Sequence, residues 1–180
     1  MKPPLDQWLA EPSLRVVHRR ESRAAAPELW EAARTVKLSD TRLLGRLVRW
    51  RIPGTSRHIA YYELFSSAPF TVIHEDDWSL VSGLVGRIWT LKRDYPRLAG
   101  AEEFRDWSEP GTARVLFANW VEAGERGGAA LASEARVTPT DREGRLGLRA
   151  VRPLVAASNG LIAREGIAAA VRLAEDRRSR

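Results

Sequence analysis

The order of segment types along the chain constrains its fold more than any other feature of the sequence. Residues 61–138 read as β-prone runs separated by turns, whereas residues 140–177 repeat apolar side chains at helical spacing. A shorter helical stretch, residues 27–49, follows a first strand predicted over residues 13–22. This order predicts an α+β domain in which a curved antiparallel sheet packs against the last helix. An apolar hollow between sheet and helix would suit a small molecule.

The length and composition of the chain fit a single globular domain. Of 180 residues, 44% are hydrophobic and 29% are charged, as in chains that bury a core of their own. We expect one domain over residues 13–175, after a loose Pro-rich lead-in, residues 1–12, and before a basic tail, residues 176–180. Trp8 and Leu9 are the lead-in side chains able to tether it to the body.

The composition also excludes several classes of function. Without cysteine, the chain has no disulfide, thiolate nucleophile or Cys-ligated metal. No run approaches the roughly 18 apolar residues of a membrane span, and the N-terminus lacks the apolar core of a signal peptide. We therefore expect a cytoplasmic protein. The net charge is +6, but the arginines are scattered, so nucleic acid is not the expected partner. Homo-oligomerisation stays open.

The strands are predicted from alternation and β-propensity. Residues 59–65, 70–74 and 84–91 are rich in aromatic and β-branched side chains. The clearest signal is a hairpin of residues 113–121 and 129–138, which are separated by glycines.

The two faces of this hairpin differ in polarity. Asn119 and Ser133 lie on an otherwise apolar face, whereas Trp120, Glu134 and Arg136 lie on the other. We expect the first face to point inward and the second toward solvent. Glu134 and Arg136 would then form an exposed charge pair worth less than about 1 kcal/mol.

The final helix carries one residue that conflicts with it. Thr140 or Asp141 is the expected N-cap, because both side chains accept hydrogen bonds from a first turn. Pro153 lacks the N–H that a helix interior needs, so we expect a kink or break there.

Four stretches give the chain a resemblance to a known superfamily. They are GLVGRIW (83–89), EPGTARVLFANW (109–120), LASEARVTPTD (131–141) and LIAREGIAAAVRLAE (161–175). On these stretches the chain resembles the START-like, or SRPBCC, superfamily over about residues 13–175. It looks similar to a bacterial, mainly actinobacterial, branch that resembles polyketide cyclases and dehydratases. The resemblance implies a helix-grip fold: a seven-stranded antiparallel sheet around a long C-terminal helix, with two short helices after the first strand. It implies a hydrophobic cavity and no specific reaction.

No motif for metal binding or nucleophilic catalysis is present. The three histidines are far apart in sequence, and no GxSxG elbow occurs. We expect neither a metal nor a cofactor. The partner that we expect is a hydrophobic or amphipathic small molecule, bound by side chains facing the cavity and by an aromatic residue at its mouth. The predicted lining residues are Tyr62, Val72, His74, Trp89, Phe117, Asn119, Ser133, Leu154 and Ile162, with Trp107 at the mouth.

Three classes of function remain open at this point. The first is a binder or carrier without chemistry. The second is a cyclase- or dehydratase-type enzyme, in which His74, Tyr62 or Asn119 would act as acid, base or oxyanion support. The third is an accessory interaction protein whose cavity is filled by its own side chains.

Overall fold

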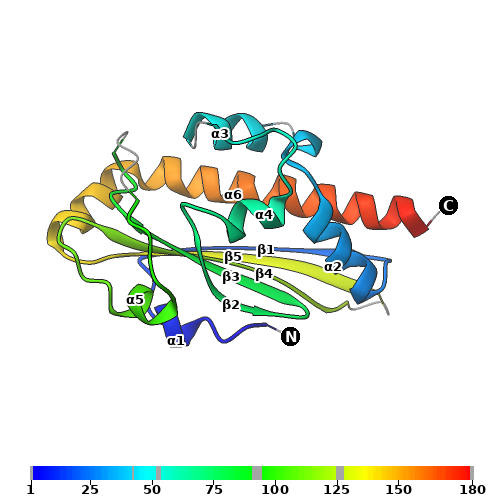
Figure 1. Ribbon diagram of the computed structural model, residues 1–180, viewed down its shortest axis with the longest axis horizontal. Helices are drawn as coiled ribbons and strands as arrows, with labels where there is room; N and C mark the ends of the chain where they lie inside the picture. The colour runs from blue at the N-terminus through cyan, green and yellow to red at the C-terminus, as the bar shows by residue number, and fades with distance from the viewer. Residues whose placement is uncertain (1, 42, 52–53, 91–94, 125–127, 179–180) are drawn as a thin grey trace.

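The computed structural model shows an α+β fold with one antiparallel sheet and a long C-terminal helix (Figure 1). It describes residues 2–41, 43–51, 54–90, 95–124 and 128–178, with the backbone alone described for Arg51 and for residues 154–163. The helical elements are α1 (Asp6–Leu9), α2 (Ala26–Thr35), the 3-10 turn η1 (Leu38–Asp40), α3 (Leu44–Arg51), α4 (Tyr61–Ser66), α5 (Ala101–Asp106) and α6 (Arg142–Arg178).

The described strands form a five-stranded sheet in the order β1-β5-β4-β3-β2, with every neighbouring pair antiparallel. The hairpin predicted from alternation is confirmed as the central pair of this sheet, β4 and β5. The strands are β1 (Leu14–Ser22), β2 (Thr71–Asp76), β3 (Ser79–Gly86), β4 (Ala113–Ala123) and β5 (Ala129–Pro139).

The expected seven-stranded sheet is wrong for the described residues, which contain five strands. One predicted strand, residues 59–65, is mostly helix α4 instead. Its buried residues Tyr61, Leu64 and Phe65 follow the i, i+3, i+4 spacing of a helix, which outweighs the β-propensity of aromatic side chains. A second predicted strand, residues 84–91, overlaps only the end of β3, which begins at Ser79 and ends at Gly86.

The expected kink or break at Pro153 is not a break, because the C-terminal helix runs through this residue as one element of 37 residues. Asp141 is the N-cap, as predicted, because its Oδ1 accepts the Gly144 N–H at 2.7 Å. The helix packs on β1, β5 and α2. Tertiary packing along this length stabilises a helix that loses one backbone hydrogen bond at proline.

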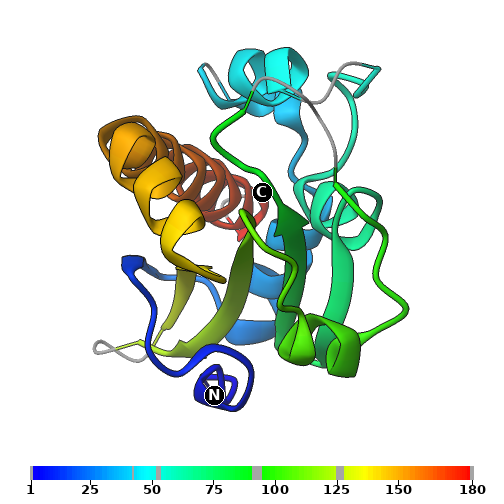
Figure 2. The same ribbon diagram turned by 90° about the vertical axis from the view of Figure 1, so that its left-hand side faces the viewer.

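Both faces of the sheet are covered, as the two views together show (Figures 1 and 2). On one face, α6 and α2 cover apolar side chains such as Phe117 and Leu131. On the other face, α1 and α5 cover Leu116 and Trp120. Phe104 of α5 comes so close to β3 that a Cβ at Gly83 would lie 2.6 Å from its ring.

The N-terminal residues 2–12, which we call the strap, cover part of the second face. The strap was expected to be loose, but its side chains Leu5, Trp8 and Leu9 are all buried. Trp8 and Leu9 thus provide the tether that the sequence allowed. The prediction that Trp120, Glu134 and Arg136 face solvent is wrong, because they lie in the second buried face.

A buried ionic cluster joins the strap to this face. Glu134 is 0% exposed. Its carboxylate accepts hydrogen bonds from Lys2 Nζ at 2.9 Å, from Arg15 at 2.7 and 3.0 Å, and from Arg136 Nε at 2.6 Å. Arg136 Nη1 donates in turn to Asp6 at 2.6 Å and to the Leu9 carbonyl at 2.5 Å. Every charge buried here has a partner, which removes much of the cost of burying it.

These partners decide the ionisation of Glu134. Burial by itself would raise the pKa of the Glu134 carboxyl group. The hydrogen bonds from Arg15, Lys2 and Arg136 outweigh that effect and lower its pKa from 4.5 to about 2. The carboxylate therefore stays charged at any pH near neutral.

Replacing Trp8 with alanine tests the packing of the strap. Because Trp8 is 8% exposed, we expect Trp8→Ala to lower the free energy of unfolding by about 3 kcal/mol. Trp78→Ala is the matched control, since Trp78 is 37% exposed and should change it by less than about 1 kcal/mol. Urea denaturation of both variants is the measurement. If both variants lose the same small amount of free energy of unfolding, the strap does not pack on the sheet.

The second prediction concerns the pH dependence of stability. Because the pKa of Glu134 is lower in the folded protein than its ordinary 4.5, its stabilising effect is complete above about pH 4.5 and is lost as the pH falls toward 2. At pH 7, Glu134→Gln should cost about 3 kcal/mol, because it removes the carboxylate that pairs with the buried guanidinium of Arg136. This difference from wild type should shrink between pH 4.5 and 2, as measured by chemical denaturation.

The control for this experiment is Glu122→Gln. Glu122 pairs with Arg19 at 2.6 Å on the same face of the sheet but is partly exposed. We expect it to change the free energy of unfolding by less than about 1 kcal/mol. Wild-type and Glu134→Gln curves that run parallel from pH 7 to pH 2 would contradict the low pKa.

Candidate functional site

Three polar side chains lie next to one another across the sheet, on the face that α6 covers. The register pairs His18 of β1 with Ser133 of β5, and Ser133 with Asn119 of β4. Their neighbours on the same face, such as Leu131 and Ala135, are apolar core residues. We call His18, Ser133 and Asn119 the polar row.

The polar row is buried and lacks partners. Asn119 is 9% exposed and Ser133 is 5% exposed. Neither side chain forms a hydrogen bond with any residue that the structure describes, and His18 Nε2 is buried without one. Ser82 of β3 pairs with Phe117 on the same face of the sheet. Its hydroxyl is also buried without a hydrogen-bond partner among the described residues. Buried polar groups are normally hydrogen-bonded, so the row calls for a partner.

The electrostatic surroundings keep His18 neutral. Burial lowers the pKa of His18, and the guanidinium of Arg164 on α6 lowers it further. A neutral imidazole offers one N–H donor and one acceptor. The row can therefore donate a hydrogen bond to a neutral polar group and also accept one from it.

A small internal space lies beside the row. It has a volume of about 20 Å³ and is bounded by Asn119, Tyr62, Leu131 and Ile167, among others. This volume holds about one water molecule.

Aromatic side chains fill much of the layer between the sheet and α6. The Phe117 ring lies 5.1 Å from the ring of Phe65 and 5.6 Å from that of Phe70, measured between centroids. The ring of Trp89 packs against α6 at Gly147. A Cβ at Gly147 would lie 2.5 Å from this ring, so only a glycine leaves room for it. Predicted lining residues Phe117 and Trp89 thus lie between sheet and helix, together with Val72.

Tyr62 is held at the edge of this layer by polar contacts. Its hydroxyl donates to Glu75, and Arg34 lies 4.9 Å from its ring centroid. Burial, followed by the interaction with Glu75, raises the pKa of Tyr62 to about 12. The phenol therefore stays protonated and serves as a hydrogen-bond donor, not as a base.

Two of the predicted lining residues lie on the opposite face. A β-bulge between Val72 and His74 breaks the alternation of β2, so these two residues do not share a face as expected. His74 instead stacks on Trp8 of the strap, with ring centroids 5.6 Å apart. Trp107 packs on the same side, and its indole N–H donates to Thr112 Oγ1 at 3.0 Å.

The remaining predicted residues, Leu154 and Ile162, lie outside the described side chains. Of the acid–base candidates considered for a cyclase, Tyr62 and Asn119 border the same internal space, whereas His74 lies on the other side of the sheet. Among the described residues, no group of three His, Asp or Glu side chains could hold a metal ion. Sequence reasoning missed His18, although the alternation of β1 places it on the same face as Val16 and Arg20.

Comparisons with known proteins do not assign the chain to a family. No protein-family model matches it, and no curated protein matches it in sequence. The structure by itself defines an α+β protein whose antiparallel sheet packs against a C-terminal helix. None of the described helices is both long enough and apolar enough to cross a membrane.

The unpartnered state of Ser133 leads to a stability prediction. We expect Ser133→Ala to leave the free energy of unfolding unchanged or to raise it by up to about 1 kcal/mol, because it removes a buried hydroxyl without a partner. Ser22→Ala is the matched control on the neighbouring strand. The Ser22 hydroxyl accepts the Ala24 N–H at 3.2 Å and donates to Glu175 at 3.3 Å. Its loss should cost about 1 kcal/mol in chemical denaturation. Equal losses in the free energy of unfolding of the two variants would contradict the inference that the Ser133 hydroxyl has no partner.

Proposed function

We propose that this protein binds an amphipathic small molecule between the sheet and α6, and that it is a helix-grip protein of the START-like superfamily. The observation that carries the proposal is the polar row: Asn119, Ser133 and His18 Nε2 are buried beneath α6 without a partner among the described residues. A fully buried group such as His18 Nε2 costs about 1–3 kcal/mol when it stays unpaired. A ligand that hydrogen-bonds to the row would recover that free energy.

The surroundings of the row define the rest of the ligand. The walls beside Asn119 are the side chains of Trp30, Leu131 and Ile167. Burying an apolar ligand against them would contribute about 25 cal/mol per Å² of surface removed from water. The proposed ligand is therefore mostly apolar, with one hydroxyl, carbonyl or amide that reaches the row. Its polar group fixes its orientation, and its apolar part supplies most of the affinity.

Binding at the row requires local movement. The space at Asn119 is about 20 Å³, which is smaller than any such ligand. A ligand that reaches Asn119 has to displace side chains that border this space, and Tyr62 is a partly exposed member of that border. The bound state would then be a minor conformation of the free protein that the ligand selects.

Native mass spectrometry of the purified protein, compared with the denatured chain, tests the proposal. We expect a discrete added mass that disappears on denaturation, or saturable binding of the neutral dye N-phenyl-1-naphthylamine if the protein purifies empty. The double variant Asn119→Leu with Ser133→Ala should weaken binding at least ten-fold, because it removes two polar contacts.

His74→Ala is the control for this experiment. His74 stacks on the strap, on the far side of the sheet, so binding should not change. A protein that carries no added mass and does not bind the dye would contradict the proposed function. So would dye binding that His74→Ala weakens and the double variant leaves unchanged.

A further inference from the structure

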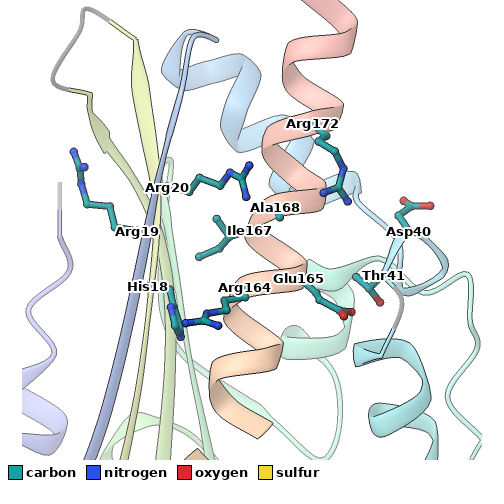
Figure 3. Close-up of a pocket in the computed structure, with 10 residues that line it drawn as sticks. All are labelled: His18, Arg19, Arg20, Asp40, Thr41, Arg164, Glu165, Ile167, Ala168 and Arg172. Atoms are coloured by element: carbon teal, nitrogen blue, oxygen red, sulfur yellow. The ribbon is translucent and has the colours of Figure 1, made fainter. Parts of the chain in front are cut away.

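A second hollow lies outside the sheet–helix layer, between the edge strand β1 and α6 (Figure 3). Its volume is about 840 Å³, within the range of sites for small organic molecules. We call it the outer cleft. His18 and Arg20 line it from β1, and Arg164, Ile167 and Arg172 line it from α6. Ile167 also borders the small internal space, so the two hollows lie on either side of one side chain.

Three arginines around the outer cleft have no counter-ion among the described residues. Arg20, Arg164 and Arg172 form no hydrogen bond or ion pair with the residues that the structure describes. In Figure 3 the side chain of Arg20 extends from β1 toward α6, that of Arg164 extends toward His18, and that of Arg172 lies along α6 on the side of Asp40. Arg19 differs, since it lies on the other side of β1 and pairs with Glu122 at 2.6 Å.

The two carboxylates of the cleft form no ion pair with these three arginines among the described residues, and they accept backbone N–H groups instead. Glu165 accepts the N–H groups of Leu43 and Leu44, each at 2.9 Å, and so caps the start of α3. Asp40 accepts the Lys37 N–H at 2.9 Å. The arginine side of the cleft therefore keeps its positive charge.

His18, which also belongs to the polar row, lines the same cleft. Its Nε2 is buried and has no hydrogen-bond partner in the described part of the chain. Its ring lies beside the Arg164 side chain (Figure 3). An anion seated there could accept a hydrogen bond from the imidazole and from the guanidinium together. Hydrogen bonds of this charge-assisted kind are about twice as strong as neutral ones.

We propose that the outer cleft binds the phosphate or carboxylate group of a small organic anion through Arg20, Arg164 and Arg172. The apolar part of the anion would lie on Ile167 and Ala168. This site shares His18 and Ile167 with the surroundings of the polar row, but its three arginines do not border the internal space, so the two sites can be tested separately. Among the described residues, the lining contains no Phe, Tyr or Trp on which a nucleic-acid base could stack. This favours a small molecule over a single strand.

Calorimetric titration with octyl phosphate, octanoate and octanol tests the site. We expect the phosphate and the carboxylate to bind and the neutral alcohol not to bind, and the stronger of the two acids identifies the anionic group. Arg164→Ala and Arg172→Ala should each weaken binding about ten-fold, since each removes a hydrogen bond to a charged group. Arg149→Ala is the matched control, an exposed arginine of α6 outside the cleft, and should change nothing.

NMR titration of His18 provides a second readout. The charged groups that line the cleft with it are Arg19, Arg20, Asp40, Arg164, Glu165 and Arg172, none of which ordinarily titrates between pH 5.5 and 8. A bound anion should therefore raise the pKa of His18, because it favours the protonated imidazole. The chain has three histidines, so His18→Asn assigns the signal.

Three results would overturn the proposal. The first is binding that the arginine variants leave unchanged. The second is equal affinity for octanol and octyl phosphate. The third is tighter binding of a thymidine oligonucleotide than of octyl phosphate, with the same arginines required, which would assign the cleft to nucleic acid. Dye binding by the polar row is measured separately, so failure here leaves the proposed function unaffected.

Discussion

The burial of β4 and β5 on both faces is the constraint on which the rest of the structure depends. The two strands pair from Ala113–Pro139 to Ala123–Ala129 at the centre of the sheet, and nearly all their side chains are buried. An antiparallel sheet can leave one face to solvent, but this one cannot, because both faces carry apolar side chains. The helix α6 covers one face, and the strap and α5 cover the other.

Glu134 on the strap face and the polar row on the α6 face differ in their hydrogen bonding. On the strap face, the carboxylate of Glu134 has three cationic partners, so its charge is fully compensated. On the α6 face, Asn119 and Ser133 have no partner among the described residues. One hydroxyl on the strap face, that of Ser79, also lacks a partner in the described part of the chain, but the α6 face groups its unpartnered polar residues in one row across three strands. This grouping directs the functional proposal to the α6 face.

The sequence predicted the elements whose periodicity is long and regular. The β4–β5 hairpin, α2 and the C-terminal helix with its Asp141 cap were all expected from spacing. The errors fall on short or irregular segments. The aromatic run at Tyr61 to Phe65 satisfies both strand propensity and helical spacing, and α4 resolves the conflict by burying Tyr61, Leu64 and Phe65 together. The bulge before His74 shifts one side chain to the other face and leaves no signal in the sequence.

The sequence alone determined which residues alternate, which repeat at helical spacing and which polar residues lie on an apolar strand face. These are local properties, fixed by backbone geometry and side-chain chemistry. The tertiary structure alone decided what covers each face. Nothing local indicates that the strap reaches Glu134, or that His18 lies beside Ser133 and beneath Arg164, because these contacts join residues more than 100 positions apart. Both proposed sites depend on such contacts, and for that reason the sequence predicted Asn119 and Ser133 but not the outer cleft.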